Sequence, residues 1–154
     1  MKNMMLQVKK FSKIALCALL IMAAGCKGKN EPESIHGDKT APSWSAPEDY
    51  DYSSSMTAVV KVDLQSQYPE SAADFTINEK DLLAAFADEQ CLGVASPQDG
   101  LFFLYIAGTE GSVTLRYYSA QYKNLFAAEP IPYQNDTHLG TVAEPYSPAF
   151  SVIK

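Results

Sequence analysis

Short apolar segments separated by turn-forming residues constrain the fold of this chain more than any other feature. They recur at intervals of about ten residues from residue 56 onward, with Gly, Pro, Asp or Asn between them. In the first segment, residues 56–64, every second residue is apolar, which is typical of a strand with one buried face. Many short strands with regular turn signals predict an all-β domain. We therefore expect an antiparallel β-sandwich of about seven to nine strands.

A first hairpin is expected at residues 81–95. Two short apolar runs flank a polar turn at residues 87–90. A helix over residues 79–89 is the alternative, because the apolar residues there also fit helical spacing and alanine favours helices. Further strands are expected near the C-terminus, at residues 124–128, 131–133, 137–143 and 149–153.

A second hairpin is expected from strands at residues 101–106 and 112–119, joined by a Gly-containing link. If Ala107 pairs with Ser112, this hairpin has one coherent inward face, because register decides which side chains share a face. That face holds Phe102, Leu104, Ile106, Val113, Leu115 and Tyr117, and the opposite face holds Phe103, Tyr105, Thr114, Arg116 and Tyr118.

The first 25 residues predict an export signal. Four lysines and no acidic residue precede an unbroken run of 11 apolar residues at 14–24. This run is shorter than the roughly 20 residues that a membrane-spanning helix needs. The following Ala23-Ala24-Gly25-Cys26 resembles the lipobox of bacterial lipoproteins, although that family prefers Leu where Ala23 stands. The resemblance implies that Cys26 becomes the first mature residue and is anchored to the membrane by acyl chains such as palmitate.

We expect three segments in the chain: a cleaved signal peptide at 1–25, the lipidated cysteine with a disordered tether at 26–43, and a single β-sandwich domain at 44–154. The tether is rich in Lys, Glu, Gly, Ser and Pro, a composition that cannot bury enough apolar surface to order itself. Lys27 follows the cysteine, and no acidic residue there signals inner-membrane retention as in enteric bacteria. The expected location is therefore the outer membrane, facing either the cell surface or the periplasm.

Charge and cysteine content narrow the possible partners. All 18 acidic residues follow residue 25 but only eight of the 12 basic ones do, so the mature chain has a formal charge of −10. Such a surface repels phosphate backbones, which argues against nucleic-acid binding. Cys17 leaves with the signal and Cys26 is lipidated, so Cys91 has no partner for an intrachain disulfide.

The order of several motifs from Trp44 onward resembles an immunoglobulin-like β-sandwich module of exported Bacteroidetes proteins. The matching residues are Trp44, Tyr52, Met56-Thr57, Asp81 to Phe86, Cys91 to Ala95, Gly108, Arg116-Tyr117-Tyr118, Leu139-Gly140-Thr141 and Pro145. Leu92 departs from the pattern, which has a basic residue there. The resemblance implies an immunoglobulin-like sandwich in a surface or secreted protein, and it implies no enzymatic activity.

The candidates for catalysis and metal binding are few. Cys91 and His138, with Asp136 to orient the histidine, are one conceivable nucleophile and base. A buried free cysteine more often behaves as a small apolar residue. Acidic residues provide the other candidates, either as pairs for glycoside hydrolysis or, at Asp49, Asp51 and Asp81, as weak calcium ligands. Neither set has a motif, and we expect no cofactor and no metal.

Exposed aromatic residues are the remaining functional signal. Tyrosine and tryptophan are favoured at interfaces and stacking surfaces. The candidate ligand-binding residues are Trp44, Tyr50, Tyr52, Phe103, Tyr105 and Tyr118. The sequence therefore predicts a non-catalytic, lipid-anchored binding module for an envelope protein partner or a glycan. The alternative is a small lipoprotein hydrolase that uses acidic residues or Cys91 with His138.

Overall fold

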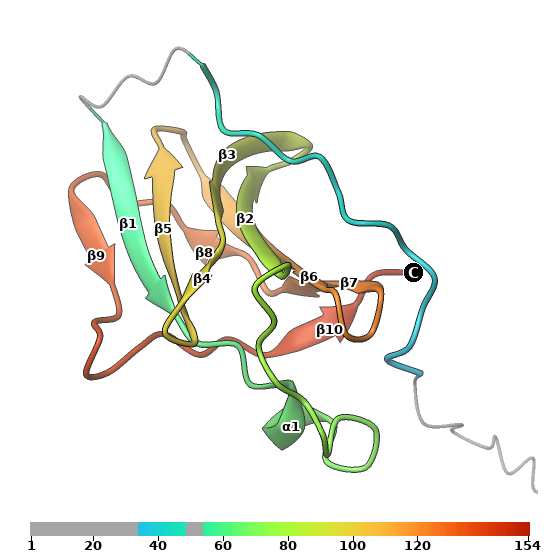
Figure 1. The fold of residues 1–154 in the computed structure, drawn as a ribbon. Coiled ribbons are helices and arrows are strands. Elements are labelled where there is room, and N and C mark those ends of the chain that lie inside the picture. Colours follow the sequence, from blue (N-terminus) through green and yellow to red (C-terminus); the bar gives the residue numbers. More distant parts are fainter. Residues whose placement is uncertain (1–33, 49–53) are drawn as a thin grey trace, which may run out of the picture. The chain divides into compact units, whose positions relative to one another are not determined.

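The computed structural model describes residues 34–48 and 54–154, which form two β-sheets packed as a sandwich (Figure 1). The strands are β1 (Ser55–Val60), β2 (Leu82–Ala87), β3 (Gln90–Ala95), β4 (Pro97–Gln98), β5 (Leu101–Ala107), β6 (Ser112–Ser119), β7 (Asn124–Ala128), β8 (Ile131–Pro132), β9 (Thr137–Leu139) and β10 (Phe150–Val152). One short helix, α1 (Leu64–Gln67), follows β1 in the described part of the chain. Eight strands have three residues or more, and the predicted all-β sandwich is confirmed.

The two sheets have different sizes. Sheet A has the strand order β4-β5-β1-β9, and sheet B has the order β10-β7-β6-β2-β3, with β8 pairing the start of β6. The strand pairs are antiparallel except for β1 and β9, which run parallel. This one parallel pair departs from the expected antiparallel arrangement, because β9 reaches sheet A from sheet B instead of through a hairpin with β1.

The first strand has the predicted inward face but ends earlier than expected. Met56, Ala58 and Val60 are buried, as the alternation of β1 requires. The strand stops at Val60 because Asp63 caps α1, with its carboxylate accepting a hydrogen bond from the Ser66 N–H at 3.0 Å. Leu64 is therefore buried from a helix and not from the strand.

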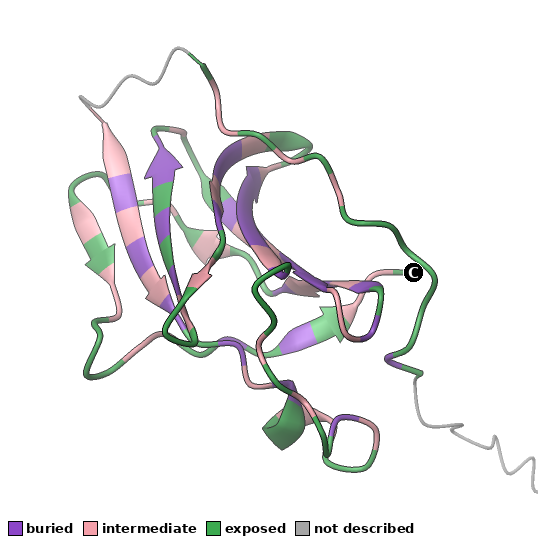
Figure 2. Ribbon diagram, viewed as in Figure 1, coloured by how far each residue is buried: buried purple, intermediate pink, exposed green. Residues whose placement is uncertain are grey.

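The hairpin at residues 81–95 is confirmed, and the alternative helix is wrong. β2 and β3 pair across a turn in which Asp88 has φ of +51°, a conformation that Asp tolerates better than most residues. β2 is buried along nearly its whole length, whereas exposed and buried residues alternate along β5 (Figure 2). The outer face of β2 is therefore covered by another part of the protein, whereas the outer face of β5 is open to solvent.

The second predicted hairpin is wrong, although its inward residues are correct. β5 lies in sheet A beside β1, and β6 lies in sheet B beside β2, so the link between them crosses from one sheet to the other. The six residues predicted to face inward are all buried, with at most 2 % exposed: Phe102, Leu104, Ile106, Val113, Leu115 and Tyr117. The apolar sides of β5 and β6 face the core in either arrangement, as neighbours in one sheet or as strands of two sheets packed against each other.

Residues 34–48, here called the N-terminal strap, pack along sheet B (Figure 1). Ile35 is fully buried in the core. The Gly37 N–H donates to the Tyr122 carbonyl at 3.0 Å, and the Lys39 N–H donates to the Lys123 carbonyl at 2.8 Å. The predicted tether therefore does not extend to residue 43, since its part from residue 34 onward belongs to the domain. Its earlier part lies outside the described residues.

Candidate functional site

The outer side of sheet A carries an aromatic and polar surface that we call the open face. Its residues are Ser55, Thr57 and Val59 on β1, Phe103 and Tyr105 on β5, and His138 on β9. Strand register brings them together, because Thr57 pairs with Tyr105 on one side and with His138 on the other, and Val59 pairs with Phe103. Three strands that are distant in the sequence thus build one surface.

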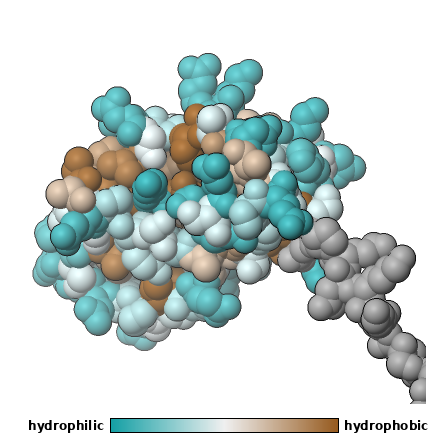
Figure 3. Space-filling view, turned by 90° about the horizontal axis from the view of Figure 1, so that it is seen from below, coloured by the Kyte–Doolittle hydropathy of each residue, from teal (hydrophilic) through white to brown (hydrophobic). Residues whose placement is uncertain are grey.

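The two aromatic side chains of the open face are exposed. Phe103 is 43 % exposed and Tyr105 is 42 % exposed. Val142, in the loop after β9, is the one other large hydrophobic residue of the described ranges that is exposed. On the side of the molecule drawn in Figure 3, hydrophobic residues occur in small groups between hydrophilic ones. Paired exposed aromatics on one strand are therefore unusual for this surface.

Hydrogen bonds hold the polar groups of the open face. The Ser55 hydroxyl donates to the Tyr105 hydroxyl at 3.0 Å, which fixes the position of the phenol ring. Thr57 Oγ1 and His138 Nδ1 are also hydrogen-bonded, which takes up one of the two ring nitrogens of the exposed histidine. The surface thus combines stacking rings with groups that can donate or accept hydrogen bonds. None of its six residues is Asp, Glu, Lys or Arg.

The outer side of sheet B differs, because the strap covers it. Trp44 packs its ring edge-on against Phe86 of β2, with the ring centroids 5.5 Å apart. The Tyr118 hydroxyl donates to the Lys39 carbonyl at 3.4 Å. Phe86 is only 4 % exposed and Tyr118 only 5 % exposed. The outward-pointing aromatics of sheet B are therefore part of an intramolecular contact.

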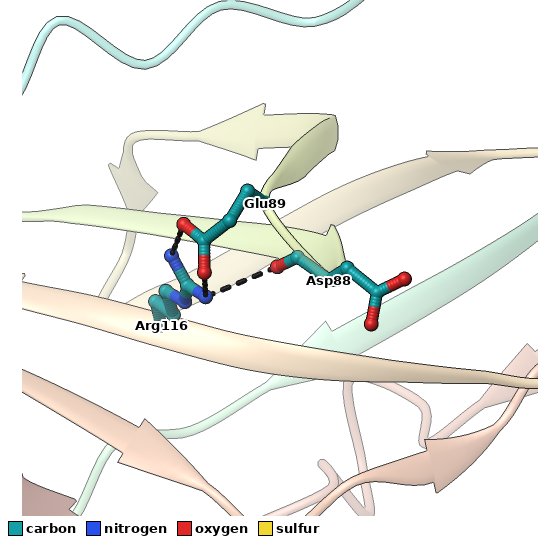
Figure 4. A network of polar contacts seen from close by, with 3 residues as sticks. All are labelled: Asp88, Glu89 and Arg116. Atoms are coloured by element: carbon teal, nitrogen blue, oxygen red, sulfur yellow. Dashed lines mark hydrogen bonds and ion pairs between the residues drawn. The ribbon is translucent and has the colours of Figure 1, made fainter.

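Arg116 forms an ion pair with Glu89 on the outer side of sheet B (Figure 4). Its guanidinium lies 4.2 Å from the centre of the Phe86 ring and donates two hydrogen bonds to the Glu89 carboxylate and one to the Asp88 carbonyl. Hydrogen bonds from Arg116, together with its positive charge, hold the pKa of Glu89 below its usual value. These contacts tie β6 to the turn between β2 and β3, so Arg116 has a structural role.

The predicted aromatic site is thus divided. Phe103 and Tyr105 lie together on the open face as expected, whereas Tyr118 does not, because β5 and β6 belong to different sheets. Trp44 is half-buried against Phe86. Tyr50 and Tyr52, like the predicted lipidation site Cys26, lie outside the described residues.

Sequence reasoning missed four contributors to the open face: Ser55, Thr57, Val59 and His138. The alternation in residues 56–64 already places Thr57 and Val59 opposite the buried positions. The local sequence pattern of each strand does not predict that β1 pairs with β5 and β9, because these strands are far apart in the chain.

The structure does not bring Cys91 and His138 together. Cys91 lies on β3, an edge strand of sheet B, and His138 lies on β9, an edge strand of sheet A. The two residues therefore belong to different sheets. The Cys91 thiol donates to the Gly93 carbonyl at 3.6 Å, and burial raises the pKa of this thiol. A raised pKa leaves less thiolate and a weaker nucleophile. Asp136 accepts its side-chain hydrogen bond from Asn135.

Asp81 is fully buried, and hydrogen-bond donors surround its carboxylate. It accepts hydrogen bonds from the Tyr117 hydroxyl at 2.6 Å, the Ala120 N–H at 2.8 Å and the Asn78 N–H at 2.9 Å. Burial raises the pKa of this carboxyl, and the three hydrogen bonds oppose that rise. Asp49 and Asp51 lie outside the described residues. Within residues 34–48 and 54–154, no three His, Cys, Asp or Glu side chains are grouped as metal ligands.

A hollow of about 430 Å³ lies beside the loop between β5 and β6. It is lined by Pro47, Ser54, Gln90, Leu92, Ala107, Gly108, Thr109 and Glu110. Glu110 is the single titratable side chain among the described residues of this lining, so these residues provide no acid–base pair.

No helix in the described ranges is both long and apolar enough to span a membrane. Comparison of the chain with protein-family models, with characterised proteins and with solved structures gives no match.

Proposed function

We propose that this protein is a lipid-anchored, non-catalytic binding module of the bacterial envelope and that the open face is its binding surface. The observation that carries the proposal is the difference between the two outer sheet faces. Sheet B is covered by the chain's own strap, whereas sheet A exposes Phe103 and Tyr105 beside hydrogen-bonding side chains. An exposed aromatic surface on a rigid sheet, held by internal hydrogen bonds, is pre-organised for binding.

The arrangement of the polar residues also supports a binding role over catalysis. Cys91 and His138 lie in different sheets, and the carboxylate of Asp81 is taken up by three internal donors. Arg116 neutralises Glu89 at the turn after β2. Each of these candidate catalytic residues has a structural partner or position that accounts for it without a catalytic role.

Site-specific photo-cross-linking in living cells tests the binding face. Phe103 is replaced by a photoreactive phenylalanine derivative, and Val142, an exposed residue of the loop after β9 that is not part of the open face, receives the same replacement as a control. We expect a discrete adduct from position 103 and none from position 142. Equal labelling from both positions, or none from either, would contradict the open face as a binding surface.

The membrane anchor is tested separately. Intact cells are treated with a membrane-impermeant amine reagent, and the wild type is compared with Cys26→Ala. We expect the wild type in the membrane fraction and the variant in the soluble fraction, because loss of the thioether removes the acyl chains. If the wild type is labelled, the protein is on the cell surface. If it is protected from the reagent, the protein faces the periplasm. An unchanged membrane fraction for Cys26→Ala would contradict lipidation.

A further inference from the structure

We infer that the open face binds a neutral glycan chain, stacked on Phe103 and Tyr105. This inference rests on the proposed function and names its ligand class. It is argued from the spacing of the two rings, the exposed area that they offer, the polar groups beside them and the charge of the surface.

The two rings form a short row along β5. Residues two apart on a strand share a face and are separated by about 7 Å. Phe103 and Tyr105 therefore stand one after the other along the strand, with Val59 and Thr57 beside them on β1. An extended chain of sugar rings that runs parallel to β5 can place its apolar ring faces on both aromatics. This arrangement suits a polymer better than a single small molecule.

The exposed aromatic area fits a glycan better than a protein. An aromatic side chain presents about 150–250 Å², and Phe103 and Tyr105 are 43 % and 42 % exposed. The two rings together thus offer roughly 130–210 Å². A stable protein interface buries about 800 Å² on each partner. The apolar part of the open face is far smaller than that, and is the size for stacking a few sugar rings.

The polar groups next to the rings suit a ligand covered with hydroxyls. The Tyr105 hydroxyl accepts a hydrogen bond from the Ser55 hydroxyl, which holds a polar group at the edge of the row of rings. His138 is exposed, and Thr57 occupies only one of its ring nitrogens. A sugar hydroxyl at the edge of a stacked ring can therefore exchange a hydrogen bond with the second ring nitrogen of His138.

Charge selects neutral glycans over acidic ones. The open face contains no charged residue type, while the mature chain carries a net charge of −10. Interactions between exposed charges persist over about 8 Å at physiological ionic strength. An anionic polymer on this face would be repelled by the net negative charge of the protein, and a neutral polymer would not.

Affinity electrophoresis of the whole protein in mild detergent tests this inference. The gels contain soluble starch, laminarin, xylan, yeast mannan or galactan as neutral probes, and polygalacturonate as the acidic probe. We expect retardation by at least one neutral polymer and none by polygalacturonate. Phe103→Ala and Tyr105→Ala should each weaken binding by roughly tenfold or more, since about 1.4 kcal/mol of lost stacking corresponds to that factor.

Two further variants make the result specific. Tyr105→Phe keeps the ring and loses the hydroxyl, so it should bind better than Tyr105→Ala. Val142→Ala removes an exposed apolar residue that is not part of the open face and should bind like the wild type. Thermal unfolding confirms that each variant is folded.

Two outcomes overturn the glycan inference: no retardation by any of the five neutral polymers, or retardation that the double variant Phe103→Ala/Tyr105→Ala retains. The cross-linking experiment then separates the two proposals. A protease-sensitive adduct at position 103 without glycan binding leaves the binding module standing with a protein partner. The absence of both removes the proposed function as well.

Discussion

Asp81 is the residue on which the interior of sheet B most depends. Its carboxylate joins the turn before β2, through the Asn78 N–H, to β6 and the following turn, through the Tyr117 hydroxyl and the Ala120 N–H. Burying a charged group is costly unless hydrogen bonds compensate for its lost hydration. All three groups around the Asp81 carboxylate are hydrogen-bond donors, so the site requires a side chain with two accepting oxygens.

We predict that Asp81→Asn lowers the free energy of unfolding by about 2–3 kcal/mol. The amide replaces one carboxylate oxygen with an NH₂ group, which then faces a donor and leaves buried groups unsatisfied. Urea unfolding followed by tyrosine fluorescence measures the effect. Asp88→Asn is the matched control, because Asp88 is exposed in a turn and Asn tolerates its positive φ. A stability loss equal to that of the control would show that Asp81 has no such role.

Tyr122 gives the protein a stability loss at alkaline pH. Its ring stacks on Phe75, and its hydroxyl donates to the Asp74 carboxylate at 3.2 Å. Burial, followed by the negative charge of Asp74, raises the pKa of Tyr122 to about 12. The phenol ionises near pH 10 in the unfolded chain. Unfolding therefore releases a proton between these values, and stability falls as the pH rises from 10 through 12.

Tyr122→Phe isolates this effect. At pH 8 the variant should be less stable than the wild type by about 1 kcal/mol, because it lacks the hydrogen bond to Asp74. Above pH 10 this deficit should shrink, since phenylalanine has no proton to lose and only the wild type is penalised. Urea unfolding at pH 8, 10 and 11 provides the measurement. A deficit that is constant across this range would contradict the raised pKa.

Among the elements, β3 and β5 approach each other unusually closely at Gly93. A Cβ atom on Gly93 would lie 1.9 Å from the Tyr105 carbonyl oxygen, closer than any real contact. β3 leads directly into β4, which pairs with β5, so the chain passes from sheet B to sheet A at this corner. A residue without a side chain lets the backbones meet there.

Gly93→Ala should therefore destabilise the fold by about 3 kcal/mol or more, because backbone must move to admit the methyl group. Gly100→Ala is the control. Gly100 has φ of +78° with no atom within 4 Å of its added Cβ, so alanine there is strained but meets no neighbour, and about 1–2 kcal/mol is expected. Thermal unfolding compares the two variants. Equal losses in both would mean that the corner is not tightly packed.

The limits of sequence prediction are also clearest at the level of elements. Strands such as β6 and β7 were predicted at their observed bounds, because alternation and turn residues are local signals. The partner of β5 could not be predicted, because the residues after it suit a tight turn as well as a crossing between sheets. For this reason Tyr118 was placed beside Tyr105, and His138 was not. The strap was missed because one buried residue, Ile35, anchors a polar segment.

At the level of the whole molecule, the strap changes how the domain relates to its proposed anchor. With Ile35 in the core, eight residues separate this buried position from Cys26. A fully extended chain of that length spans about 30 Å. A tether that ran to residue 43 would reach nearly twice as far. The open face of a lipidated protein would thus sample a thin layer above the bilayer, where an envelope polymer would be met.

The strap also decides where the folding unit begins. The contacts of Ile35 and Lys39 with sheet B predict that a chain of residues 44–154 is less stable than one of residues 34–154. The loss should be at least about 2 kcal/mol, the contribution of burying one isoleucine side chain. Urea unfolding measures it, and the chain of residues 26–154 with Cys26→Ala is the control, expected to match residues 34–154. The shorter chain should also bind a hydrophobic dye, because the core around Ile35 is opened and Tyr118 loses its contact with Lys39. If residues 44–154 were as stable as residues 34–154 and bound no dye, the strap would not belong to the domain, and the contrast between an open and a covered face would lose its basis.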